Sequence, residues 1–186
     1  MPRVKGLAFR SVFVALEALE GSAAVERTRA LLAPETSERL RALTASSWYP
    51  LADYANMWSS IQSATGQRKD LPRLIGRRAV EQDLRLTHKL AFAALSVETV
   101  LSISMRLFGT YYDTGKCKTE QLGPRKVRAS FQGCIGFTEP MWTEVRGGIE
   151  CFAEQASKTR ATSTLVSGGG EGEQQCVVEV SWFAKA

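Results

Sequence analysis

The first half of the chain shows the apolar periodicity of amphipathic helices. In the first predicted helix, apolar side chains recur at three- and four-residue intervals and share one stripe: Phe9, Val12, Phe13, Leu16 and Leu19. Gly21 is expected to end this helix, because glycine accepts the backbone conformation that follows a helical C-terminus. Two short helices are predicted next, over residues 23–33 and from Pro34, since proline fits the first turn of a helix.

Helical periodicity continues through the middle of the chain. The pattern stops at Pro50 and resumes with one apolar face: Leu51, Tyr54, Met57, Trp58 and Ile61. A long helix is predicted over residues 71–95, with Pro72 in its first turn. Ser96 is predicted to cap the helix that follows, and Gly109 to stop it.

The last third changes to the two-residue period of half-buried strands. Alternate positions of one stretch are apolar: Val127, Ala129 and Phe131. Residues 117–122 are expected to pair with this strand across the turn at 123–124. The same alternation returns in residues 160–167 and 174–183, which flank the loop GGGEGE and predict a second hairpin.

A helix is predicted between the two hairpins. Thr138 is its expected N-cap, and the apolar face continues to about Ser157. Gly147 and Gly148 lie inside this helix, where each glycine costs about 1 kcal/mol relative to alanine. A close approach of another backbone would compensate for that cost, so tight packing is expected at this point.

Together these elements predict an α+β fold in a single domain over residues 1–186, with a helical part at 1–112 and a sheet part at 113–186. The N-terminal helices are expected to pack on an antiparallel sheet of about four strands, made of two hairpins separated by a helix. The chain has 186 residues, of which 44% are apolar and 23% charged, as in globular proteins with a substantial core.

The net charge of +5 arises from 24 Lys and Arg against 19 Asp and Glu. Basic residues gather around Arg77 and Arg78, but carboxylates such as Glu81 and Asp83 are interleaved with them, which indicates solvated helix faces. A nucleic-acid partner is therefore not expected. No apolar run approaches the ~20 residues of a membrane span, and charges interrupt the N-terminal apolar stretch, so we expect no span and a cytoplasmic protein.

No residue pattern identifies a catalytic or metal-binding site. His88 is the only histidine, so any hydrolase triad or haem ligation would depend on it, and the absence of a CxxCH motif favours an ordinary helical histidine. Wide spacing favours reduced thiols over a zinc site for the cysteines: Cys117, Cys134, Cys151 and Cys176. Two carboxylate pairs fit acid–base chemistry or a solvated helix face equally well: Glu139 with Glu144, and Glu150 with Glu154.

Several segments carry a family resemblance: GLAFRSVFVALE, WYPLADY, GRRAVEQDL, YYDTGKCKTEQLGPRKVRASFQGCIGF and VEVSW. They resemble a family of uncharacterised proteins that is expanded as paralogues in myxobacteria. More distantly, the glycine-rich hairpin with Cys176 in its last strand is similar to the ligand-binding fold of 4-vinyl reductase domains, haem-NO-binding-associated domains and TRAPP Bet3-type subunits. This resemblance implies either a ligand pocket between helices and sheet or a helical face for dimerisation.

The cofactors of those relatives are not expected here. Sensor members of the vinyl-reductase group hold zinc through clustered cysteines, whereas the cysteines of this chain are scattered. The haem-binding relatives use a proximal histidine with a Tyr-x-Ser-x-Arg motif, which the segment from Tyr112 to Lys116 does not supply. We therefore predict neither a metal nor another cofactor.

The function expected from these observations is a non-enzymatic sensor or regulatory module that binds a small apolar ligand between helices and sheet. The candidate ligand-binding residues are aromatic: Trp48, Tyr49, Trp58, Phe108, Tyr111, Tyr112 and Trp142. Core packing explains the same aromatic set. The alternative is a homodimeric protein–protein interaction scaffold with Gly147 and Gly148 at its interface. An enzyme is less favoured, because no catalytic group is identified.

Overall fold

A computed structural model describes residues 1–87 and 96–183, and it confirms the α+β fold class. The helices in the described ranges are α1 (Gly6–Glu20), α2 (Ser22–Ala30), α3 (Pro34–Arg41), α4 (Leu51–Ala64), α5 (Leu71–Thr87), α7 (Val97–Tyr111) and α8 (Glu139–Ser157). The strands are β1 (Arg3–Lys5), β2 (Trp48–Pro50), β3 (Lys116–Gly123), β4 (Lys126–Gln132), β5 (Ala161–Gly168) and β6 (Cys176–Trp182).

The main sheet is antiparallel, with the strand order β3-β4-β6-β5. The two predicted hairpins are both present, and pairing of β4 with β6 joins them into one sheet. One face is apolar because alternate residues of the central strands are buried: Val127, Ala129, Phe131, Val178 and Val180. The opposite face carries ion pairs, since Glu179 lies 2.6 Å from Lys126 and 2.7 Å from Arg128. The sheet therefore needs a cover on one face only.

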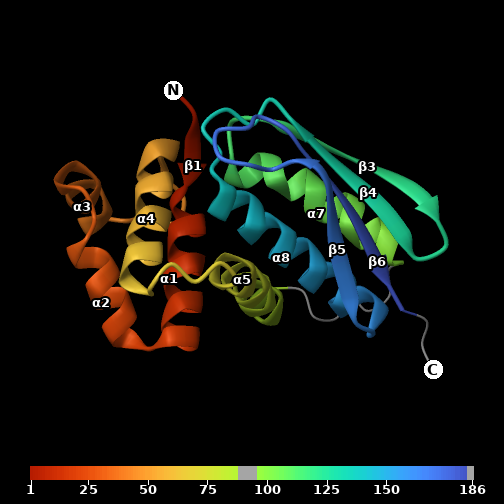
Figure 1. Ribbon diagram of the computed structural model, residues 1–186, viewed down its shortest axis with the longest axis horizontal. Coiled ribbons are helices and arrows are strands. Elements are labelled where there is room, and N and C mark those ends of the chain that lie inside the picture. Colours follow the sequence, from red (N-terminus) through yellow and green to blue (C-terminus); the bar gives the residue numbers. More distant parts are fainter. Residues whose placement is uncertain (88–95, 184–186) are drawn as a thin grey trace.

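Two helices provide that cover. Figure 1 shows α7 and α8 lying against the sheet, with α5 on the side of α8 away from the strands and α1 next to α5. Helices α2, α3 and α4 complete the opposite end of the molecule from the sheet. A small second sheet, which the sequence pattern did not predict, pairs β1 with β2 and fixes the start of α1 beside α4.

Helices α5 and α8 approach each other through glycine. A Cβ atom on Gly76 would overlap the carbonyl oxygen of Glu144, and one on Gly147 would overlap the carbonyl oxygen of Arg73. Gly148 faces Val80 of α5. The close backbone approach expected at the glycine pair is confirmed, and its partner is α5.

Helix ends follow the predictions in part. Ser96 caps α7 as predicted, because its hydroxyl accepts a hydrogen bond of 3.2 Å from the Thr99 amide. The prediction that Gly109 stops this helix is wrong, since α7 continues to Tyr111. Thr138 precedes α8, but a carboxylate from the glycine-rich loop, Glu171, accepts from the first amide of that helix instead. Residues 88–95 of the predicted long helix lie outside the described residues.

Candidate functional site

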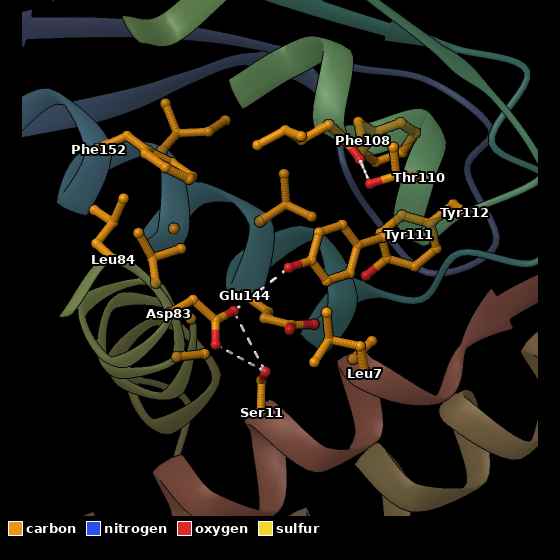
Figure 2. Close-up of a pocket in the computed structure, with 18 of the residues that line it drawn as sticks. Leu7, Ser11, Asp83, Leu84, Phe108, Thr110, Tyr111, Tyr112, Glu144 and Phe152 are labelled. Carbon is orange, nitrogen blue, oxygen red and sulfur yellow. Dashed lines mark hydrogen bonds between the residues drawn. The ribbon is translucent and has the colours of Figure 1, made fainter. Parts of the chain in front are cut away.

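A cavity of about 330 Å³ lies among α1, α5, α7 and α8. Only Phe131 of the sheet reaches it, so the cavity lies mainly between helices (Figure 2). Most of the wall is apolar, and its larger side chains are Leu84, Leu107, Phe108, Ile149 and Phe152. This size and lining fit a small organic ligand, because ligand pockets typically measure about 300–1,000 Å³ and are mostly apolar.

Polar groups of the wall gather on one side of the cavity. Figure 2 shows Ser11 of α1, Asp83 of α5, Tyr111 of α7 and Glu144 of α8 close together. Ser11 and Tyr111 each direct a hydroxyl at the Asp83 carboxylate, at 3.4 Å. Burial raises the pKa of Asp83 above its usual value, and burial together with the Asp83 charge raises the pKa of Tyr111 to about 12.

Glu144 is the most perturbed carboxyl group of this cluster. Its side chain is partly accessible in the cavity wall and otherwise enclosed by protein. The Tyr54 hydroxyl contacts its carboxylate oxygens at 2.7 and 2.9 Å, and the Trp58 indole N–H faces it without reaching hydrogen-bonding geometry. Burial raises the pKa of Glu144 from 4.5 to about 7, while these two donors oppose the rise. The carboxyl group is therefore poised to exchange a proton near neutral pH.

Three of the aromatic residues predicted to bind ligand lie in the cavity wall. They are Phe108, Tyr111 and Tyr112, which lie together at the end of α7. Tyr112 is buried, and burial raises its pKa well above the usual value. In the segment from Tyr112 to Lys116, which lacks the haem-binding motif, the Thr114 hydroxyl donates a hydrogen bond to the Gly133 carbonyl.

The other four aromatic candidates lie away from the cavity. Trp58 and Trp142 are core residues with 0% and 1% exposure. Tyr49 is buried in the core beside Phe9. Trp48 is partly exposed on β2, where the Lys5 ammonium lies 4.2 Å from its ring centroid. The sequence identifies these residues as aromatic, but it cannot show which of them border a cavity and which pack in the core.

The other residues considered from the sequence either pack within the fold or lie outside the residues that the structure describes. Gly147 and Gly148 are buried against α5 of the same chain, which leaves neither glycine on an exposed helix face. His88 lies outside the described residues. All the cysteines are free thiols, and no cluster suited to a metal ion occurs within residues 1–87 and 96–183.

From the sequence, Glu144 was considered only in an acid–base pair with Glu139, and Asp83 was interpreted as part of a solvated helix face. Glu144 follows Met141 by three residues and precedes Gly148 by four, so it shares a helix side with two buried positions. This spacing was the one sign in the sequence that Glu144 faces the interior, although it does not show which residues pack against that side of the helix.

Glu150, in the second predicted carboxylate pair, has a different role. It is 0% exposed and accepts two hydrogen bonds from Arg73, at 2.5 and 2.8 Å, and one of 2.9 Å from the Ser163 amide. Although burial favours its neutral form, the bonds from Arg73 and Ser163 lower the pKa of Glu150. Glu150 therefore joins α5, α8 and β5 as an ionised structural residue.

Comparisons with known proteins identify the fold. No protein-family model and no curated protein matches the chain. A mutant H-NOX protein from K. algicida, in the unliganded Fe(II) form, is similar with a TM-score of 0.73 and 12% identity over 97% of each chain. An oxygen-binding H-NOX domain related to soluble guanylate cyclases, in its oxygen complex, gives 0.68 and 14% over 98% of each chain. A mutant H-NOX of T. tengcongensis gives 0.66 and 12% over 96% of this chain and 97% of its own.

These similarities show that the chain has the fold of H-NOX domains. Another similar structure comes from work on heme distortion in the H-NOX family, and a further one from work on heme redox potential and porphyrin distortion. The proposed myxobacterial family and the likeness to 4-vinyl reductase and TRAPP subunits stay predictions. Within the described ranges, no helix is both long and apolar enough to span a membrane.

Proposed function

We propose that the chain is a non-enzymatic sensor or regulatory module that binds a small apolar ligand in the cavity among α1, α5, α7 and α8. The observation that carries this proposal is the pocket itself, because its volume and its mostly apolar wall with a few polar groups are typical of small-molecule sites. The H-NOX-like fold supports the sensor assignment. The proposal includes the cytoplasmic location that was predicted from the sequence.

The described cavity wall does not fit haem. A porphyrin brings two propionate carboxylates, whereas the wall offers the acidic groups of Asp83 and Glu144 and, among the described residues, no Lys or Arg. Its only described side chains that serve as haem ligands elsewhere are Tyr111 and Tyr112, whose raised pKa values disfavour the phenolate that would bind iron. We therefore assign the cavity to an organic ligand other than haem.

A cavity-filling variant tests the proposal. Val145 lies in the wall, so Val145→Phe places an aromatic ring where the ligand would bind. Val166→Phe makes the same change at a strand position that is 50% exposed and serves as the matched control. Thermal unfolding and native mass spectrometry would be measured with a panel of apolar and aromatic compounds.

The wild-type protein and Val166→Phe should retain the same panel members and be stabilised by them, while Val145→Phe should not. Ligand at a hundredfold excess over Kd contributes about 2.7 kcal/mol, or about 5–10 °C in Tm for a chain of this size. A wild-type protein that no panel member stabilises would sink the proposal. A Soret band in protein from haem-supplemented cultures, lost in His88→Ala, would assign the site to haem instead.

The alternative function, a homodimeric scaffold, placed Gly147 and Gly148 at its interface. Because both glycines contact α5 within the chain, they do not support a helix interface with a second copy. Light scattering at high concentration distinguishes the two functions, since a strict monomer that binds a panel compound fits the sensor and not the scaffold.

A further inference from the structure

We propose that the ligand of the cavity is a hydrophobic organic cation, with an apolar body among the helices and a protonated amine paired with the Glu144 carboxylate. The inference rests on the proposed function and names the ligand class for that same site. It follows from the charge of the polar side of the cavity and from the partners of Glu144.

Among the described residues, the groups around Glu144 are hydroxyl and indole donors and one further carboxylate, and none of them is a cation. They come from every element packed against it: Tyr54 and Trp58 of α4, Tyr111 and Tyr112 at the end of α7, Asp83 of α5 and Ser11 of α1. Arg10 of α1 acts on Asp83, but its side chain is exposed and outside the cavity wall. Within the described chain, Glu144 therefore has hydrogen-bonding partners and no counter-charge.

The Trp58 indole supports a site built for an ionised carboxylate. Trp58 is 0% exposed, its N–H has no hydrogen-bond partner, and this N–H faces Glu144. A buried N–H without a partner costs free energy, which a fully negative carboxylate beside it would offset. A cation bound in the cavity would hold Glu144 in that ionised state, since a buried charge is favourable only when it is paired.

The charged and aromatic groups of the cavity wall favour a cationic ligand over an anionic or a neutral one. An anion would lie beside the carboxylates of Asp83 and Glu144, and like charges repel. A neutral apolar ligand would leave an ionised Glu144 buried without a counter-charge among the described residues. The aromatic wall formed by Phe108, Tyr111 and Phe152 adds surface that attracts a cation as well as an apolar body.

Three compounds of nearly equal shape test the ligand class: 1-naphthylmethylamine, 1-naphthylmethanol and 1-naphthoate. Their Kd values would be measured by calorimetry at pH 8 and pH 5.5 with wild-type protein, Glu144→Gln and Glu139→Gln. The glutamine introduced by Glu144→Gln keeps a carbonyl acceptor for Tyr54, so the fold should be retained. Glu139 is an exposed carboxylate of the same helix and outside the wall, which makes Glu139→Gln the matched control.

At pH 8 we expect the wild-type protein and Glu139→Gln to bind the amine at least about tenfold more tightly than the alcohol, as one ion pair provides. This preference should disappear in Glu144→Gln and shrink at pH 5.5, where Glu144 is protonated, while alcohol binding persists. Equal binding of amine and alcohol at pH 8, or preference for naphthoate, would overturn the cation inference but leave the apolar pocket. If none of these compounds or the wider panel binds, the proposed function itself fails.

Discussion

Two glutamates on α8 show how local donors decide the state of a buried carboxyl group. Glu144 has neutral donors, and burial raises its pKa to about 7. Glu150, six residues further along the helix, receives hydrogen bonds from Arg73 and Ser163 that lower its pKa despite its burial. The charged donor makes the difference, because hydrogen bonds from ionised groups are stronger and compensate for lost hydration.

These opposite shifts predict opposite effects of pH on the stability of two glutamine variants. A carboxyl whose folded pKa is raised costs stability as pH rises from its unfolded pKa of 4.5 to about 7. Glu144→Gln should therefore stabilise the fold at pH 8, by up to about 3 kcal/mol, and change little at pH 4. Urea unfolding at both pH values checks this result. A Glu144→Gln effect that is independent of pH would contradict the assignment.

The variant Glu150→Gln should show the reverse dependence. The lowered pKa of Glu150 contributes stability that is present above 4.5 and is lost as pH falls through the folded pKa. We therefore expect Glu150→Gln to destabilise the fold at pH 7, by about 1–3 kcal/mol for the hydrogen bonds to a charged partner, and progressively less below pH 4. Urea unfolding from pH 3 to pH 7 measures it, and a loss that persists undiminished at pH 3 would refute it.

The roles of these residues could be predicted from the sequence only in part. Helical spacing places Glu144 and Glu150 on α8, but the groups that set their protonation are distant in the chain: Tyr54 is 90 residues from Glu144, and Arg73 is 77 from Glu150. By contrast, Phe108, Tyr111 and Tyr112 were identifiable as candidates because an aromatic cluster suits either a core or a pocket wall. The type of a residue can be read from the sequence, whereas its protonation state depends on the residues that the fold brings next to it.

At the scale of elements, the crossing of α5 and α8 determines the shape of the cavity. Gly76 and Gly147 bring the two helix backbones into contact at this crossing, and Gly76 and Gly148 also belong to the cavity wall. The sequence predicted a tight contact at the glycine pair, since two glycines inside a helix need compensation. It could not name α5 as the partner, because periodicity describes one helix at a time.

Alanine substitutions at two helical glycines should therefore have opposite effects. Gly147→Ala would place a methyl group on the Arg73 carbonyl of α5, and backbone cannot move aside as a side chain can. We expect a net loss of about 1–3 kcal/mol, as for overpacked cores, despite the better helix propensity of alanine.

The matched control for that substitution is Gly109→Ala on α7. An added Cβ at Gly109 meets no atom within 4 Å, so the fold should gain about 0.5–1 kcal/mol from propensity alone. Denaturant midpoints of both variants measure the difference. Equal effects of the two substitutions would show that α5 and α8 are not in backbone contact.

At the scale of the whole molecule, the fold was more accessible to sequence analysis than the site. Two-residue alternation predicted both hairpins, because the sheet has one apolar face and one charged face. The pairing of β4 with β6 was not predictable from that pattern, since α8 separates the hairpins in the chain. Similarity to H-NOX domains at 12–14% identity fits this division, because one fold accommodates widely different sequences.

The single domain predicted for residues 1–186 stays a proposal, and unfolding cooperativity tests it. One connected core runs from Val4 on β1 to Trp182 on β6, so loss of either end exposes apolar surface of the other. We expect one two-state transition, with far-UV circular dichroism and tryptophan fluorescence coinciding, because the tryptophans are distributed along the chain: Trp48, Trp58, Trp142 and Trp182. A bound amine should shift both signals together, since the cavity is walled by α1 from one end of the chain and α8 from the other. Separate transitions, of which ligand shifts only one, would instead divide the chain into a ligand-binding unit and an independent remainder.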